Sequence, residues 1–216
     1  MDTLKARSEL VRELRRKGIK DERALKAIGE TPRHLFLPPE LAHVAYADEA
    51  LPIGYHQTIS QPYVVALMTQ SLALQGQEKV LDVGTGSGYQ AAILALICAE
   101  VVTVEVLPEL SEEARRRLET LGVNNVRFLI GDGSEGAPDE APFDGIIVAA
   151  AAPYTPQPLI DQLAENGRLV IPIGSREDQD LTLIKKVGAE LRNANLGLVR
   201  FVPLIGRYGF ADRNML

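Results

Sequence analysis

The stretch Lys79-Val80-Leu81-Asp82-Val83-Gly84-Thr85-Gly86-Ser87-Gly88-Tyr89 decides the fold of this 216-residue chain. A short apolar run ends in an acid, and three glycines then occupy alternate positions. Residues 90–96 follow, and their alanine and leucine content favours a helix. We therefore predict a strand, a sharp glycine turn and a helix whose first amide groups face a ligand. A strand-to-helix turn without any ligand is the alternative interpretation.

The spacing of the glycines limits the kind of ligand. A dinucleotide fingerprint, G-x-G-x-x-G, would need its third glycine where this chain has Tyr89. A phosphate loop would need a lysine after its last glycine, and none follows Gly88. The pattern Asp82-Val83-Gly84-x-Gly86-x-Gly88 resembles motif I of the S-adenosylmethionine-dependent methyltransferases. That cofactor has no phosphates, and its carboxylate and ribose need backbone amides and an acid instead.

Composition excludes several classes of protein. A net charge of −6 without a basic stripe argues against nucleic acid as the main partner. The single cysteine, Cys98, excludes an internal disulfide framework and a thiolate metal cluster, and its apolar surroundings predict a buried structural thiol in a helix. The N-terminus lacks the apolar core of a signal peptide, and no apolar run is long enough to span a membrane. We expect a cytoplasmic protein without a metal site.

The rest of the chain predicts an α/β fold. Two helices are expected within residues 3–30, the first ending at Gly18 and the second capped by Asp21. Residues 31–61 are rich in proline and read as an irregular, functional loop. Further helices are expected at 107–121 and 158–164, and further strands at 101–105, 126–130, 143–148, 168–173, 181–187 and 196–202. Alternation of strands and helices predicts a doubly wound, mostly parallel sheet with an antiparallel C-terminal edge.

Ser60 stands just before another predicted helix, because Pro62 suits a first turn and Val64, Val65, Met68 and Leu72 recur at helical spacing. Ordinary capping of that helix is one interpretation of Ser60. The other is that the hydroxyl and the free amides of the helix start hold a carboxylate. His56 stands nearby, and a packing role is favoured there over that of a catalytic base.

A resemblance covers nearly the whole chain. Thr58-Ile59-Ser60-Gln61-Pro62, followed by the glycine loop, is similar to the protein-L-isoaspartate O-methyltransferase family. Further matches are Gly131-Asp132-Gly133, Ala150-Ala151-Ala152-Pro153 and the segment 166–174. The resemblance implies a seven-stranded, Rossmann-like methyltransferase fold in one domain, 1–216, with a helical N-terminal extension (1–61) and a cofactor-binding core (62–210).

The predicted site follows from the strand ends together with this resemblance. Glu105 ends a strand and would accept the ribose hydroxyls, Asp132 would accept the adenine amino group, and Asp82 would orient the glycine loop. Ser60 is the predicted catalytic residue. The complete set of expected cofactor-binding residues is Thr58, Ile59, Asp82, Gly84, Thr85, Gly86, Ser87, Gly88, Glu105, Asp132 and Gly133, and that of substrate-binding residues is Ser60, Gln61, Val202 and Pro203.

The resemblance implies methyl transfer from S-adenosyl-L-methionine to the α-carboxylate of L-isoaspartyl residues, which leaves S-adenosyl-L-homocysteine. The ester would collapse to a succinimide and so begin repair of damaged proteins. The partners would be isoaspartyl peptides and proteins, with neither nucleic acid nor membrane, and the chain is expected to be a monomer. The alternatives are a methyltransferase with a small-molecule acceptor and a non-enzymatic nucleotide-binding module.

Overall fold

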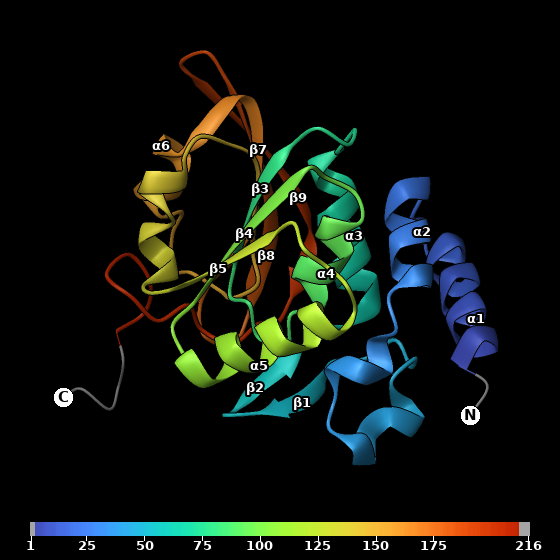
Figure 1. The fold of residues 1–216 in the computed structure, drawn as a ribbon. Coiled ribbons are helices and arrows are strands. Elements are labelled where there is room, and N and C mark those ends of the chain that lie inside the picture. The colour runs from blue at the N-terminus through green and yellow to red at the C-terminus, as the bar shows by residue number, and fades with distance from the viewer. Residues whose placement is uncertain (1–2, 212–216) are drawn as a thin grey trace.

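A computed structural model describes residues 3–211 of the chain, so the ends of the predicted domain, 1–2 and 212–216, lie outside the described residues. A seven-stranded sheet in the order β5-β4-β3-β6-β7-β8-β9 forms its centre (Figure 1). The first five strands run parallel, and β8 and β9 are antiparallel. The strands are β3 (Lys79–Val83), β4 (Glu100–Glu105), β5 (Val126–Ile130), β6 (Phe143–Val148), β7 (Leu163–Gly174), β8 (Gln179–Val187) and β9 (Glu190–Val199). This confirms the predicted fold class.

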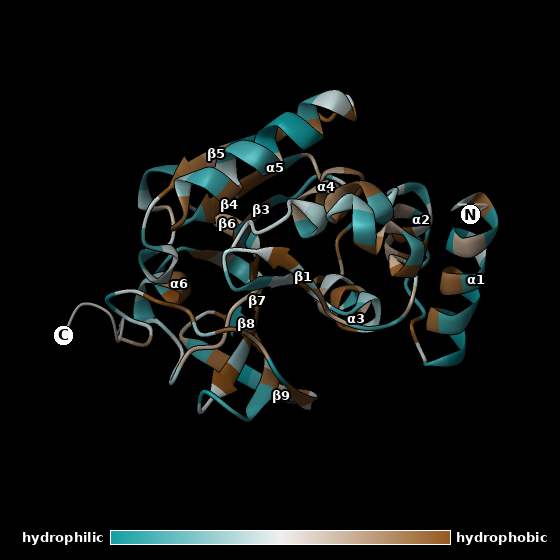
Figure 2. Ribbon diagram, turned by 90° about the horizontal axis from the view of Figure 1, so that it is seen from below, coloured by the Kyte–Doolittle hydropathy of each residue, from teal (hydrophilic) through white to brown (hydrophobic). Residues whose placement is uncertain are grey.

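Helices cover both faces of the sheet, and the strands alternate between two apolar clusters. Val80 of β3 belongs to the apolar cluster that includes α3 and α4, whereas Leu81 and Val83 belong to the cluster that includes α6 on the opposite face. A buried parallel strand presents apolar side chains to both faces in this way. The helices are α1 (Thr3–Arg16), α2 (Glu22–Glu30), α3 (Pro62–Leu72), α4 (Tyr89–Ala95), α5 (Pro108–Thr120) and α6 (Gln157–Asp161). Figure 2 shows hydrophilic residues along α5, which faces solvent.

The predicted ends of the N-terminal helices are confirmed by their capping groups. Gly18 follows α1 with a φ of 97°, a left-handed conformation that costs glycine little. The Asp21 carboxylate accepts a hydrogen bond from the amide of Ala24 and caps α2. Among the described residues, no helix is both long and apolar enough to cross a bilayer.

The loop predicted at 31–61 contains more structure than expected. It forms two 3-10 helices, η1 (Arg33–Phe36) and η2 (Pro39–Val44), and a separate hairpin of β1 (Leu51–Gly54) and β2 (Gln57–Ile59). Tyr55 and His56 form the hairpin turn, with φ values of 50° and 57°. Such turns are usually signalled by Asn or Gly, so the sequence carried no recognisable hairpin signal.

Two other predicted boundaries and the placement of Cys98 are corrected. The helix expected at 158–164 ends at Asp161, because the main chain from Leu163 already pairs with β6. The last strand spans Glu190–Val199 rather than 196–202, because its mostly exposed first half, which lacks an apolar run, also pairs with β8. Cys98 is buried as expected, but it follows the end of α4 instead of lying within the helix. Burial raises the pKa of its thiol to about 12, which agrees with a structural role.

Candidate active site

A cavity opens at the carboxyl ends of β3, β4 and β6, next to strand β2 of the hairpin. This is the place where ligands bind in open α/β sheets. Its wall combines the segment 57–60 with the glycine loop, the ends of two strands and a C-terminal segment. The lining residues are Gln57, Thr58, Ile59, Ser60, Val65, Met68, Val83, Gly84, Thr85, Gly86, Ser87, Tyr89, Gln90, Val104, Glu105, Val106, Gly133, Ala149, Ala150, Val202, Pro203, Leu204 and Ile205.

The three glycines of the loop adopt conformations that other residues would adopt only with strain. Gly84, Gly86 and Gly88 have φ values of 92°, 51° and 87°. A Cβ atom at Gly88 would lie 2.9 Å from a methyl group of Leu118, so this glycine also lets α5 approach. Gly88 does not line the cavity, whereas Gly84 and Gly86 do. The alternate glycines are thus explained by backbone geometry, and two of them face the ligand space.

Glu105 ends β4 and lies at the cavity wall, with 7% of its surface exposed. One carboxylate oxygen accepts a hydrogen bond from the amide of Gly86 at 2.9 Å, and the other accepts one from Leu107 at 3.1 Å. A carboxylate has about four acceptor sites, so capacity for further donors remains. Glu105 therefore joins the glycine loop to the next strand and can still accept bonds from a diol.

Asp82 does not line the cavity, but it is connected to the glycine loop through Thr103. Its side chain is fully buried, and the Thr103 hydroxyl donates to one carboxylate oxygen at 2.9 Å. Thr103 also shares a 2.6 Å hydrogen bond with Thr85 in the glycine loop. The second oxygen of Asp82 is buried without a partner in the described chain. Burial raises the pKa of Asp82 to about 7, and the charge of Glu105 acts in the same direction, against the Thr103 hydrogen bond.

The Asp132 carboxylate has partners within the chain, and its predicted contact with adenine stays a prediction. Its carboxylate accepts hydrogen bonds from the amide and hydroxyl of Ser134, at 2.8 and 2.6 Å, and from the amide of Arg207 at 2.7 Å. Asp132 is not among the cavity residues, whereas Gly133 is. A Cβ atom at Gly133 would lie only 2.6 Å from Val83, so the absent side chain permits this loop to approach the first strand. Asp132 thus holds the C-terminal segment against its own loop.

The C-terminal segment forms one wall of the cavity through backbone pairing. Ala151 donates to the Val202 carbonyl at 2.8 Å and accepts from Leu204 at 2.7 Å. Both Val202 and Pro203, which were predicted to bind substrate, line the cavity. The Ala150-Ala151-Ala152-Pro153 motif therefore provides the backbone groups of Ala151 that pair with the C-terminal segment 202–205.

A second cavity adjoins the first, and Ser60 lines both. The members common to the two cavities are Thr58, Ser60, Ala149 and Val202. Gln61 lines only the second, together with Asp48 and Arg200. Within residues 3–211 the Ser60 hydroxyl makes no hydrogen bond, and the helix start at Gln61 has no side-chain cap. The interpretation of Ser60 as a helix cap is therefore wrong.

Sequence reasoning missed three groups of residues around this site. Val106 follows Glu105, lines the cavity and is 49% exposed, and an exposed apolar residue after a strand-end acid could have signalled it. Tyr89 and Gln90 line the cavity from α4. Asp48, from the proline-rich loop, approaches the Ser60 turn, and only tertiary contacts show this. His56 lies at the exposed hairpin tip and lines neither cavity.

These elements define a class I S-adenosylmethionine-dependent methyltransferase. The donor set fits that cofactor, because a half-satisfied carboxylate at Glu105 suits ribose hydroxyls, and Val106 and Leu204 offer apolar surface for adenine. No phosphate-binding lysine lines the cavity among the described residues.

Comparison with known proteins identifies the family within this class. The model of the protein-L-isoaspartate(D-aspartate) O-methyltransferase family (PCMT) matches residues 5–209. The protein-L-isoaspartate O-methyltransferase of Dictyoglomus thermophilum is 55% identical over 206 residues, covering 95% of this chain and 94% of that protein. The Methanoculleus marisnigri protein of the same description is 52% identical, covering 94% and 93%. The chain belongs to the protein-L-isoaspartate(D-aspartate) O-methyltransferase family.

Solved structures agree with this assignment. One protein-L-isoaspartate O-methyltransferase structure superposes with a TM-score of 0.84 at 32% identity, covering 94% of this chain and 67% of the other. A Plasmodium falciparum protein described as a member of the family, in complex with S-adenosyl-L-homocysteine, gives a TM-score of 0.79 at 25% identity, covering 91% and 97%.

Proposed function

We propose that Ser60 binds the α-carboxylate of an L-isoaspartyl residue at the junction of the two cavities. The observation that carries this role is that Ser60 lines both cavities while its hydroxyl has no partner in the described chain. A hydroxyl in that position can donate to a carboxylate oxygen. The methyl acceptor would enter from the second cavity and meet the cofactor in the first.

Glu105 would accept the ribose hydroxyls, and the loop 84–87 with Thr58 and Ile59 would enclose the methionine end of the cofactor. Asp82 would support the loop through Thr103 and Thr85. Gly133 and Val106 would border the adenine, with Asp132 holding the loop in shape from outside. The cofactor supplies a methyl group already activated on a sulfonium. The protein's task is then to place the two reactants.

The acceptor needs little chemical activation. A carboxylate is ionised near neutral pH, so no general base has to remove a proton. Catalysis would come from alignment of the carboxylate oxygen with the methyl group and from exclusion of water. Ser60 and the neighbouring wall 202–203 would provide that alignment.

The enzyme methylates isoaspartyl residues and so initiates their repair, as its family does. The decisive assay compares two peptides that differ only in one isoaspartyl or aspartyl linkage, with labelled S-adenosylmethionine. The isoaspartyl peptide should be methylated and its aspartyl twin should not. Equal labelling of both would contradict the proposed carboxylate recognition. Cofactor binding without labelling of either peptide would point to a different acceptor or to a binding module.

The extension 1–61 and the core 62–210 would work as one domain, because the cavity draws residues from both sides of that boundary. We further expect a monomer that acts in the cytoplasm and binds neither nucleic acid nor membrane. Analytical ultracentrifugation tests the first of these expectations, and fractionation of the host cell tests the second.

A further inference from the structure

Asp48 lies behind the Ser60 turn and makes contacts that no feature of the sequence suggested. One carboxylate oxygen accepts a hydrogen bond from the amide of Tyr63, in the first turn of α3, at 2.7 Å. The other oxygen accepts from the side-chain amide of Gln61 at 3.2 Å, and the Asp48 carbonyl accepts from the same nitrogen at 2.9 Å. Asp48 thus hydrogen-bonds to Gln61 and Tyr63, which follow Ser60 in the chain.

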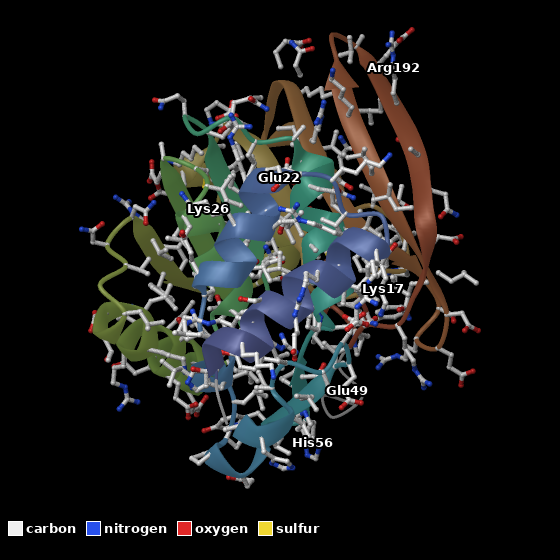
Figure 3. The ribbon with its side chains drawn as sticks, turned by 90° about the vertical axis from the view of Figure 1, so that its right-hand side faces the viewer. Lys17, Glu22, Lys26, Glu49, His56 and Arg192 are labelled. Carbon is white, nitrogen blue, oxygen red and sulfur yellow. The ribbon has the colours of Figure 1, made fainter. Side chains whose placement is uncertain are left out.

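The Asp48 carboxylate is itself held in place by charge. Lys17, which follows α1, forms an ion pair with it, and the Asp48 side chain is only 4% exposed. The Lys17 side chain is 41% exposed, so solvent reaches the pair from the lysine side while the carboxylate is shielded. Hydrogen bonding to Asp48 and Glu13 raises the pKa of Lys17, so its ammonium remains charged throughout the physiological range. Figure 3 shows Lys17 above Glu49 on one face of the molecule.

The backbone on both sides of Asp48 is anchored by a second cation. The guanidinium of Arg33, which is 0% exposed, donates to the Ala45 carbonyl at 2.9 Å and to the Glu49 carbonyl at 3.2 Å. Arg33 also stacks on the ring of Tyr89, 4.9 Å from its centroid. The backbone of segment 45–49 is therefore fixed at both ends, while the Asp48 side chain contacts Gln61 and Tyr63.

These contacts limit which donors at the N-terminus of α3 can bind a substrate carboxylate. The α3 N-terminus already has an anion, since Asp48 occupies the Tyr63 amide, and Pro62 offers no amide at all. The Gln61 side chain is turned toward Asp48 as well. The Ser60 hydroxyl is a side-chain donor in this turn that remains without an acceptor in the described chain.

We propose that Asp48 is a positioning residue for methyl transfer: it fixes the Gln61–Tyr63 backbone and thereby holds Ser60 at the junction of the two cavities. This inference rests on the proposed role of Ser60. Asp48 lines the second cavity but not the cofactor cavity. Its loss should therefore impair use of the peptide more than binding of the cofactor.

The test is the pair Asp48→Asn and Asp48→Ala in the full-length enzyme. Asparagine can still accept from the Tyr63 amide, but it loses the charge that Lys17 and Gln61 face. We expect the KM for an isoaspartyl peptide to rise about fivefold in D48N and at least twentyfold in D48A, with kcat less affected. The cofactor Kd, measured by calorimetry, should stay within twofold of the wild type in both variants.

Two further variants keep the test decisive if D48A does not fold. Gln61→Met removes the donor to Asp48 and leaves Asp48 intact, and we expect it to raise the peptide KM several-fold. Glu13→Gln is the matched control, because Glu13 also pairs with Lys17 but touches no part of the serine turn. It should leave the peptide KM unchanged.

The proposal is overturned if the cofactor Kd rises in parallel with the peptide KM, since Asp48 would then be a general structural residue. It is overturned equally if D48N and Q61M behave as the wild type. Ser60→Ala, measured beside them, separates the two claims. If Ser60→Ala has no effect while the Asp48 variants raise the KM, both the role of Ser60 and positioning through Ser60 are overturned, and Asp48 would affect peptide binding by another route. If Ser60→Ala raises the KM while D48N and Q61M do not, the role of Ser60 stands and only that of Asp48 fails.

Discussion

The carboxylate of Glu105 accepts a hydrogen bond from the amide of Gly86 at 2.9 Å. This bond joins the end of β4 to the turn that follows β3. It therefore connects Glu105, which is expected to accept the ribose hydroxyls, to the glycine loop that is expected to enclose the cofactor. A glycine at position 86, with a φ of 51°, lets the amide point toward the carboxylate. The two parts of the site are thus built together.

Glu105→Gln should weaken cofactor binding roughly ten- to hundredfold. Hydrogen bonds to a charged group contribute about 1.5–3 kcal/mol, and the variant loses the charge while keeping the shape. Isothermal titration with S-adenosylmethionine measures the change. Glu109→Gln, an exposed acid in the first turn of α5, is the control and should bind normally. An unchanged Kd in E105Q would place the ribose elsewhere.

Ser60→Ala should lower kcat/KM for an isoaspartyl peptide about tenfold or more. A lost hydrogen bond to a charged carboxylate corresponds to about 1.5–3 kcal/mol. The cofactor Kd should remain within a few-fold. Ser71→Ala serves as control, because the Ser71 hydroxyl donates only to the Leu67 carbonyl within α3. A large loss of cofactor affinity in S60A would mean instead that Ser60 shapes the cofactor cavity.

Asp82→Asn should change how stability depends on pH. The pKa of Asp82 is raised to about 7 in the folded protein, above about 3.9 in an unfolded chain, so folding favours the protonated form. Wild-type stability should therefore fall as the pH rises through this window, by at most about 4 kcal/mol. D82N lacks that titration and should gain relative to wild type above pH 7, with the gain vanishing toward pH 4.

Denaturant unfolding at pH 4, 5.5, 7 and 8.5 provides the measurement for Asp82. Asp139→Asn, which alters an exposed carboxyl, is the matched control and should follow the wild-type curve. A difference between D82N and wild type that stays constant over this range would show that Asp82 does not titrate there.

Asp132→Ala should loosen the C-terminal segment. The amides of Arg207 and Ser134 would lose their acceptor, and the wall formed by residues 202–205 would be less firmly held. We expect faster trypsin cleavage after Arg207 and a several-fold weaker cofactor Kd. Asp139→Ala is the control. Weaker cofactor binding with an unchanged cleavage rate would restore the direct contact with adenine that the sequence had suggested.

The order of the elements and the class of cofactor could be read from local patterns. Strands 126–130 and 143–148 were predicted with their observed bounds, because each is a short apolar run between turn signals. The three glycines at 84, 86 and 88 indicated a turn whose backbone needs positive φ angles. The serine motif indicated the family, which the family model and the relatives confirm.

The hairpin at 51–59 and the roles of several acids could not be predicted in the same way. Tyr55 and His56 adopt left-handed conformations that their residue types do not favour, so the surrounding structure must impose them. Asp132 looked like a ligand because it follows a strand between two glycines. Its carboxylate also accepts a hydrogen bond from the amide of Arg207, which lies 75 residues further along the chain, and no local pattern signals that contact.

By itself, the sequence determined which segments become strands and helices, where the chain must turn, and which cofactor the turn after β3 suits. These properties depend on neighbouring residues, through apolar periodicity, proline and glycine. The tertiary structure alone decided what each carboxylate does. Asp48 hydrogen-bonds to the turn after Ser60, and Asp82 is buried and accepts a bond from Thr103. Of these three acids, only Glu105 lines the cofactor cavity. Their roles depend on partners distant in sequence, which are brought within hydrogen-bonding distance only when the sheet and its loops are assembled.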